Sequence, residues 1–383
     1  MINFFNFFKR KDKYLVLDFG QSSIKGLILE KEEKAIVIKK FGAEEIKKFG
    51  VFTARDFESD IVKEAAKKTL RDLSSFNKTP DLTSIVGGFP EILKTEVFDL
   101  SFQRKKAEKK IGKAEEEEIY QSILNQENNF LEKIQKKHQQ TTRVEIIKKK
   151  IIEKKISGYP VPSLLGLRGK KLNFKILIVF AFEKDLKFLK SILTSLGLKK
   201  PLIFHEVEGL IKLTKKKNIE NRIFVDIGGR TTQIFVFKKG LDSINEFPMG
   251  GYDFTKAITN NLKTTEAEAE NLKQRMTGNQ LTGSARKEIE KIISPVIEDW
   301  GKTFFKTLRG KNKSFIALPQ KVSFFGGGSL LPQLRKIVEK ENFEIEGLDS
   351  NDIPLRNKTK FVFSAREVPT LLLAFTQNNT FTF

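Results

Sequence analysis

Two segments of this chain repeat one local pattern, and the repeat constrains the fold more than any other feature of the sequence. Residues 15–25 read LVLDFGQSSIK and residues 223–233 read IFVDIGGRTTQ. In each segment an apolar strand ends in Asp-x-Gly, small or hydroxylated residues follow, and a second apolar strand begins. Asp18 and Asp226 lie 208 residues apart, so the pattern predicts two separate strand–turn–strand units.

Such units suit the binding of phosphate. Glycine at the bend lets backbone N–H groups approach a phosphate closely, and Ser or Thr hydroxyls add donors. Asp18 and Asp226 could hold a hydrated Mg²⁺, and Lys25 could neutralise phosphate charge. One such hairpin is weak evidence, because many hairpins use Asp and Gly merely to turn. Two hairpins facing each other would clamp a nucleotide tail from both sides.

Three further pieces follow in order along the chain. Gly250-Gly251 forms a turn before an expected helix, and Gly326-Gly327-Gly328-Ser329 links a strand to a helix. Glycines there let the backbone pass against a flat ring or a phosphate, although a flexible linker has the same composition. Glu270 and Lys273 share one face of a helix, where such a pair is ordinarily a solvated ion pair.

Composition excludes several kinds of chemistry. The chain has no cysteine, which excludes disulfides and Cys-based zinc sites. It has only two histidines, so a histidine metal site or a Ser–His–Asp relay is improbable. The formal charge of +22 could attract nucleic acid or anionic lipid. It could equally reflect a compositional bias, since Phe dominates the aromatic residues. A length of 383 residues predicts two or three compact units.

The first residues form a possible membrane contact. No apolar stretch is long enough to span a bilayer, and no signal-peptide pattern is present. Four phenylalanines instead stand directly before a run of basic residues at the start of the chain: Phe4, Phe5, Phe7, Phe8, Lys9, Arg10 and Lys11. They could lie in a membrane interface, or the phenylalanines could dock on the protein's own core.

The middle of the chain differs from both ends. Residues 104–155 are rich in Lys, Glu and Gln, and residues 170–182 (KKLNFKILIVFAF) give the strongest strand pattern. We expect one helix over residues 115–137, a strand over 144–156 and a strand over 84–88. These elements predict a strand–helix–strand–strand insert between about residues 84 and 182, with a charged helical hairpin as the alternative.

Together these motifs resemble the actin/Hsp70/sugar-kinase ATPase superfamily and, within it, the bacterial cell-division family FtsA. The motifs are Asp18-x-Gly20 with Lys25, Asp226-x-Gly228-Gly229 with Thr231-Thr232, Gly250-Gly251, Ala269-Glu270-x-x-Lys273 and Gly326-Gly327-Gly328-Ser329. Residues 247–273, 158–161 and 166–172 are also very similar to FtsA stretches. The resemblance covers residues 13–375.

The resemblance implies an α/β fold of the actin-like ATPase type, with two lobes around a nucleotide cleft and an inserted SHS2-type subdomain. Its parts would be a membrane-binding segment at 1–12, a first lobe at 13–83, 183–220 and 372–383, the insert at 84–182, a second lobe at 221–262 and 316–371, and a distal subdomain at 263–315.

The resemblance also implies ATP and Mg²⁺ as ligands. The first phosphate loop would contain Asp18, Gly20, Gln21, Ser22, Ser23 and Lys25, and the second Asp226, Gly228, Gly229, Thr231 and Thr232. Gly250, Gly251, Glu270, Lys273, Gly326, Gly327, Gly328 and Ser329 would complete the nucleotide site. Glu208 could orient water, although a surface Glu at a helix start is ordinary, and hydrolysis would be slow or absent.

The resemblance finally implies a cytoplasmic protein, peripheral on the inner face of the membrane, that self-assembles into filaments and binds the C-terminal tail of FtsZ. FtsA ends in an amphipathic helix, whereas residues 377–383 are too polar for one. The Phe- and Lys-rich start, and the loop from Asp18 to Lys25, are closer to PilM of type IV pilus assembly. A PilM-like platform that grips a pilus membrane-protein tail is therefore the alternative, followed by a superfamily kinase. We expect no nucleic-acid partner, because the Phe residues lie mostly in apolar strands.

Overall fold

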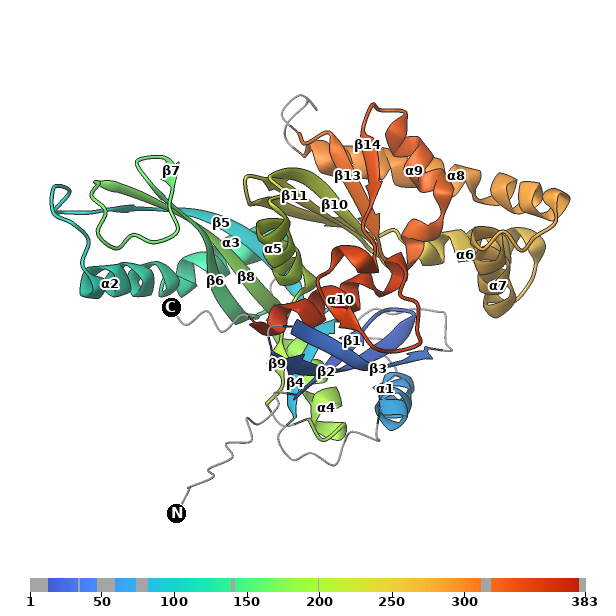
Figure 1. Ribbon diagram of the computed structural model, residues 1–383. Helices are drawn as coiled ribbons and strands as arrows, with labels where there is room; N and C mark the ends of the chain where they lie inside the picture. The colour runs from blue at the N-terminus through green and yellow to red at the C-terminus, as the bar shows by residue number, and fades with distance from the viewer. Residues whose placement is uncertain are drawn as a thin grey trace, which may run out of the picture.

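Two large β-sheets and one smaller sheet organise the molecule (Figure 1). The computed structural model describes residues 13–33, 35–46, 59–73, 82–138, 142–198, 200–310 and 318–378. The N-terminal segment expected to bind membrane, with Phe4, Phe5, Phe7, Phe8, Lys9, Arg10 and Lys11, lies outside these residues. Within them, no helix is both long enough and apolar enough to cross a bilayer.

The first sheet contains six strands in the order β15-β3-β2-β1-β4-β9. Their bounds are β1 Lys13–Phe19, β2 Ser23–Glu32, β3 Ala35–Glu45, β4 Thr83–Gly88, β9 Leu202–Ile203 and β15 Arg356–Asn357. Strands β1, β2 and β3 are antiparallel, and β4 joins β1 in parallel. Side chains of β1 alternate between two cores: Leu15 and Leu17 pack on one side and Val16 on the other.

The second sheet repeats this arrangement with five strands in the order β12-β11-β10-β13-β14. Their bounds are β10 Asn221–Ile227, β11 Thr232–Lys238, β12 Leu241–Phe247, β13 Lys321–Phe325 and β14 Glu344–Gly347. Strands β10, β11 and β12 are antiparallel, and β13 joins β10 in parallel. Strands β10 and β13 therefore correspond to β1 and β4 of the first sheet.

Helices cover both faces of each large sheet. Helices α1 (Ser59–Leu73) and α4 (Glu183–Ser195) pack on the outer face of the first sheet. Helices α6 (Gly251–Leu262), α7 (Glu266–Thr277), α8 (Gly283–Arg309) and α9 (Pro332–Glu339) pack on the outer face of the second. Helices α5 (Glu206–Lys217) and α10 (Val368–Phe375) share one core with side chains from both sheets, so they lie between them.

The third sheet projects from the first lobe, to the left in Figure 1. It contains β5 (Lys94–Gln103), β8 (Lys171–Phe182), β6 (Val144–Ile156) and β7 (Tyr159–Pro160) in that spatial order. Helices α2 (Lys113–Leu124) and α3 (Glu127–His138) cover one face with their own core. The order along the chain is thus strand, two helices, and then strands.

Three expectations about this segmentation were wrong. The predicted first strand of the insert, residues 84–88, is β4 of the first sheet; the insert's sheet begins with β5. Its charged sequence KTEVFDLSFQ hides the strand pattern, because one face of β5 is partly exposed. The helix expected over 115–137 is two helices, α2 and α3.

The third correction concerns residues 356–371, which we had placed in the second lobe. Strand β15 pairs with β3 of the first sheet, and α10 begins at Val368 and packs on α5. A two-residue strand has too few side chains to reveal its sheet from sequence. The chain therefore returns to the first lobe earlier than expected.

Candidate functional site

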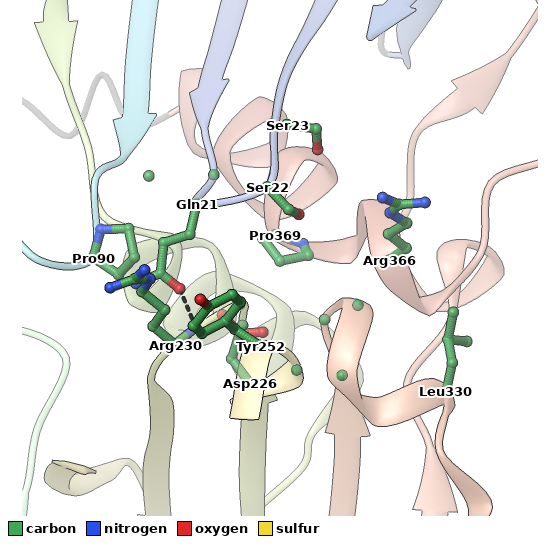
Figure 2. A pocket seen from close by; sticks show the side chains of 18 of the residues that line it. Gln21, Ser22, Ser23, Pro90, Asp226, Arg230, Tyr252, Leu330, Arg366 and Pro369 are labelled. Atoms are coloured by element: carbon green, nitrogen blue, oxygen red, sulfur yellow. Dashed lines mark hydrogen bonds between the residues drawn. The ribbon is translucent and has the colours of Figure 1, made fainter. Parts of the chain in front are cut away.

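A cleft lies where the loops after β1 and β10 face each other, between the two large sheets (Figure 2). Most of the residues predicted to bind a nucleotide line it. They are Asp18, Gly20, Gln21, Ser22, Ser23, Lys25, Asp226, Gly228, Gly229, Gly251, Glu270, Lys273, Gly326, Gly327 and Gly328. The structure thus brings together five separate stretches of the sequence.

Asp18 at the end of β1 is held by neighbouring groups. Its carboxylate Oδ2 accepts a hydrogen bond of 2.6 Å from the Thr370 hydroxyl, and Lys25 lies opposite it in the β1–β2 register. Burial raises the pKa of Asp18, although the Lys25 ammonium and the Thr370 hydrogen bond oppose this rise. Lys25 Nζ also donates to the Arg366 carbonyl at 2.6 Å, and burial lowers its pKa. This aspartate is therefore compensated within the protein.

Asp226 at the end of β10 has no cross-strand lysine, and Lys25 of the first loop opposes the rise of its pKa only in part. The residue opposite it in the β10–β11 register is Gln233, which carries no charge. Its buried Oδ1 has no hydrogen-bond partner among the described residues. Burial raises the pKa of Asp226 well above its usual range, and the carboxylates of Glu206 and Asp18 raise it further. Such a group favours a bound cation that restores its ionised form.

A glycine closes over each aspartate. Gly88, the last residue of β4, has a φ of +80°, and Gly326, directly after β13, has a φ of +83°; positive φ favours glycine. A Cβ atom on Gly88 would lie 2.6 Å from Asp18 Oδ1, and one on Gly326 would collide with Asp226 Oδ1. Each parallel strand thus ends so that its backbone packs directly on a carboxylate.

The two loops touch through Gln21. Its side-chain Oε1 accepts a hydrogen bond of 2.6 Å from the Arg230 backbone N–H, drawn as the dashed line in Figure 2. Its Nε2 donates to Glu91 Oε1 at 3.0 Å. Gly228 and Gly229 have no side chains, which gives Gln21 the room to lie against the second loop.

Glu270 and Lys273 of α7 belong to a buried network. Lys273 Nζ is 2.6 Å from Glu270 Oε2 and donates to the Gly251 carbonyl at 2.8 Å and the Thr255 hydroxyl at 2.7 Å. Burial raises the pKa of Glu270, but Lys273 and several hydrogen bonds outweigh it, so that pKa lies below its usual range. The network ties α7 to the start of α6 and forms one wall of the cleft, in place of the solvated ion pair that is usual at this spacing.

Glu208, the predicted water-orienting residue, does not line the cleft. Its carboxylate is buried on the opposite side of α5, 2.7 Å from Lys148 Nζ of the insert, and it caps the helix. The residue of α5 that lines the cleft is Glu206, and burial raises its pKa to about 8. Two residues on a helix are about 200° apart, so only one of them can face the cleft. The assignment of a catalytic role to Glu208 was therefore wrong.

Four other predicted residues support the cleft without lining it. The Thr231 carbonyl accepts from Gly228 N at 2.9 Å and closes the second loop. The Thr232 hydroxyl donates to Met249 O at 2.7 Å and accepts from the indole N–H of Trp300 at 2.9 Å. Gly250 packs on the backbone of Gly228–Arg230, and the Ser329 hydroxyl donates to Gly326 O at 2.7 Å.

Several cleft residues were not found from the sequence. They are Gly88, Pro90, Glu206, Arg230, Tyr252, Gln274, Thr277, Leu330, Leu331, Arg366 and Pro369. Arg230 and Tyr252 lie directly beside predicted glycines, and their guanidinium and ring stack at 4.8 Å. Gly88 could have been found from the repeat of the hairpins. It ends the parallel strand beside β1, as the predicted Gly326 follows the parallel strand beside β10.

Comparison with known proteins identifies the class. The structure is similar to that of the PilM-PilN type IV pilus biogenesis complex, with a TM-score of 0.68, 14% identity, and coverage of 95% of this chain and 98% of that one. It is also similar to MreB 5 of Spiroplasma citri bound to AMPPNP, with a TM-score of 0.50, 9% identity, and coverage of 94% and 95%. No curated protein sequence matches the chain.

The protein therefore has an actin-like ATPase fold, as the sequence predicted. The family described as Cell division protein FtsA matches residues 223–364, which contain the second loop and the Glu270–Lys273 pair. The expected resemblance to FtsA is thus confirmed over this part of the chain.

Proposed function

We propose that the protein binds ATP with Mg²⁺ in this cleft and uses the nucleotide as an assembly ligand. The observation that supports this most strongly is the opposed pair of Asp-Gly loops, one of which leaves a buried carboxylate oxygen unsatisfied. MreB 5, which shares the fold, was solved with AMPPNP.

The residues divide into three groups by their chemistry. Backbone N–H groups of the loops around Gly20 and Gly228 would hold phosphate oxygens, and Lys25 would neutralise their charge. Glu270 and Lys273, with the glycines at 326–328, would flank the adenosine.

Asp226 fits a cation through its unsatisfied oxygen. Among the described residues no three His, Asp or Glu side chains converge closely enough to chelate a metal directly. A Mg²⁺ ion there would therefore keep most of its waters, which it does readily, and would neutralise phosphate charge.

Glu206 takes over the role proposed earlier for Glu208. A carboxylate at this place in the cleft could accept a hydrogen bond from a water beside the terminal phosphate. Its pKa of about 8 leaves it mostly protonated at neutral pH, so only a small fraction of Glu206 is ionised and able to accept a proton. Slow hydrolysis follows, and ATP would act mainly by stabilising one arrangement of the two lobes.

The cellular role we propose is a membrane-peripheral, filament-forming scaffold of cell division that holds the FtsZ tail. The match of residues 223–364 to FtsA supports it, since this part includes the whole distal subdomain proposed to bind that tail. The insert would serve in self-association, and the N-terminal Phe/Lys segment in membrane contact.

A PilM-like platform is the second candidate, supported by the fold similarity over 95% of the chain. In that case the insert and first lobe would hold the cytoplasmic tail of a pilus membrane protein.

ATP binding is tested by titrating the protein with ATP, ADP and GTP in the presence of Mg²⁺ by calorimetry. We expect saturable ATP binding, and Lys25→Gln should weaken it by about tenfold or more, because one phosphate charge loses its counter-ion. A matched control is Lys302→Gln, since Lys302 lies exposed on α8 away from the cleft. The proposal is wrong if no nucleotide binds, or if both variants lose the same affinity.

The partner is tested by affinity capture with two immobilised peptides, one the C-terminal tail of FtsZ and the other a cytoplasmic pilus-protein tail. Binding of the first peptide alone supports the division role, and binding of the second peptide alone supports the platform.

Membrane contact is tested by deleting residues 1–11. The deletion should reduce co-sedimentation of the protein with anionic vesicles, and unchanged binding would exclude that segment as the anchor.

A further inference from the structure

Gln21 occupies the hollow of the second loop, although it belongs to the first. Its Oε1 accepts the Arg230 backbone N–H at 2.6 Å. Cβ atoms placed on Gly228 and Gly229 would lie 3.4 Å and 3.2 Å from the same oxygen. The side chain thus fills the space that the two glycines leave open.

The Arg230 N–H is one of the donors that a loop of this kind offers to an anion. Backbone N–H groups around a glycine turn converge on one point, where they bind phosphate oxygens. Here a neutral amide oxygen already stands at that point. A phosphate that takes this donor must first displace Gln21.

The amide is fixed from its other side as well. Gln21 Nε2 donates to Glu91 Oε1 at 3.0 Å, and Gln21 is 9% exposed. Burial raises the pKa of Glu91, while the Arg230 guanidinium and the Gln21 hydrogen bond lower it. Gln21 therefore loses two hydrogen bonds when it leaves, and a buried acceptor loses one.

The position of Gln21 along the cleft decides which phosphate competes with it. In Figure 2, Gln21, Pro90 and Arg230 lie at one end of the cleft, and Leu330 and Arg366 lie at the other. The wall formed by Glu270 and Lys273 packs against Gly251, near the backbone of Gly328. With the base against Glu270 and Lys273, as proposed above, the phosphates run along the second loop, and the terminal phosphate is the group that we expect to reach Gln21.

From these contacts we infer that Gln21 determines how the cleft discriminates between nucleoside triphosphate and diphosphate. The inference rests on the proposed nucleotide site. A diphosphate leaves the Gln21–Arg230 bond in place and so binds with the loops joined. A triphosphate displaces the amide, and the lost hydrogen bonds subtract from its affinity. The first loop thereby carries an internal competitor for the terminal phosphate.

Two substitutions at Gln21 separate this competition from other effects. Gln21→Ala empties the hollow, so the ratio of the ADP to the ATP dissociation constant should rise by about three- to tenfold, the value of one net hydrogen bond. Gln21→Met fills the hollow with a side chain of similar size that cannot bridge the loops. Its ratio should rise in the same direction, because displacing this side chain breaks no hydrogen bond to Arg230 or Glu91.

Gln274 supplies a matched control within the same cleft. It lies on α7, and its Nε2 donates to Glu270 Oε1 at 3.2 Å. Gln274→Ala should change the affinities for ATP and ADP by the same factor, because it lies beside the proposed base and far from the terminal phosphate. Thermal unfolding of each variant without ligand checks that the fold is intact.

The experiment is a calorimetric titration of the full chain and the three variants with Mg·ATP and Mg·ADP. A raised ratio in both Gln21 variants, with the ratio of Gln274→Ala unchanged, supports the inference. An unchanged ratio overturns it, and a lowered ratio shows instead that Gln21 binds the terminal phosphate directly. Failure of every protein to bind either nucleotide would refute the nucleotide site itself, which is a different result.

Discussion

The two hairpins that face each other across the cleft share a backbone frame but differ in charge. In both, three antiparallel strands are joined by a parallel strand that ends in a left-handed glycine over an aspartate. The residue opposite Asp18 is Lys25, whereas the residue opposite Asp226 is Gln233. One carboxylate is satisfied by the protein, and the other is left for a ligand.

This difference teaches that a repeated fold can assign different chemistry to equivalent positions by a single cross-strand residue. Neighbouring side chains on one sheet face lie close enough for a lysine to neutralise an aspartate directly. Burial raises the pKa of both aspartates, but only Asp226 keeps a buried oxygen without a hydrogen-bond partner among the described residues, which favours a cation there. The second lobe is thus the half that we expect to respond to Mg²⁺.

The largest expected effect is on the pH dependence of stability. Glu206 lines the cleft with the two aspartates and interacts electrostatically with both, and its pKa of about 8 exceeds its value in the unfolded chain. Between about pH 5 and pH 8 the folded protein holds this proton and the unfolded chain does not. The free energy of unfolding of the ligand-free protein should therefore fall by about 1.4 kcal/mol per pH unit as pH rises.

Urea denaturation of Glu206→Gln should show a slope that is flatter by this amount. Glu268→Gln is the control. Hydrogen bonds from Thr264 and Thr265 hold the pKa of Glu268 at about 2, so this residue does not titrate between about pH 5 and pH 8. Equal slopes for Glu206→Gln and the wild type would contradict the placement of Glu206.

The next effect compares the two closing glycines. Alanine at a positive φ costs about 1–2 kcal/mol in either place. In Gly88→Ala the new methyl group also meets Asp18, which Thr370 holds in position, and the Phe19 carbonyl. In Gly326→Ala it meets Asp226, whose Oδ1 has no partner among the described residues.

Gly88→Ala should therefore lower the free energy of unfolding by about 3 kcal/mol and Gly326→Ala by about 2 kcal/mol, since Asp226 can turn away more easily. Chemical denaturation of both variants measures the difference. An equal or larger loss in Gly326→Ala would show that Asp226 is fixed at least as firmly as Asp18.

A smaller effect compares the aspartates themselves. Asp18→Asn leaves Lys25 buried without its nearest opposite charge, so it should cost about 1–2 kcal/mol of stability. Asp226→Asn removes the charge of a buried carboxylate whose Oδ1 has no hydrogen-bond partner among the described residues, and it should leave stability unchanged or slightly higher. Thermal unfolding without nucleotide tests both; a clear loss in Asp226→Asn would mean that the protein itself satisfies Asp226.

Much of this site was predictable because its signals are local. An Asp-x-Gly between two apolar strands fixes both the turn and the carboxylate at its end, so Asp18 and Asp226 could be placed from sequence alone. The glycines at 326–328 also follow a strand directly and enter the cleft as expected.

The rest depended on packing that a sequence does not display. The choice between Glu206 and Glu208 follows from where α5 begins, which the buried His205 cap sets. Arg366 and Pro369 enter the cleft because residues near the end of the chain return to the first lobe. The insert was misplaced at its start because the short apolar run of β4 suits either sheet.

The most direct test of the account is the Mg²⁺ dependence of ATP affinity in the wild type and in Asp226→Asn, measured by calorimetry with Mg²⁺ and with EDTA. We predict that Mg²⁺ strengthens ATP binding to the wild type by about tenfold or more, and that Asp226→Asn loses most of this increment while keeping its Mg²⁺-free affinity. An equal Mg²⁺ increment in both proteins would contradict the assignment of the cation to the second lobe.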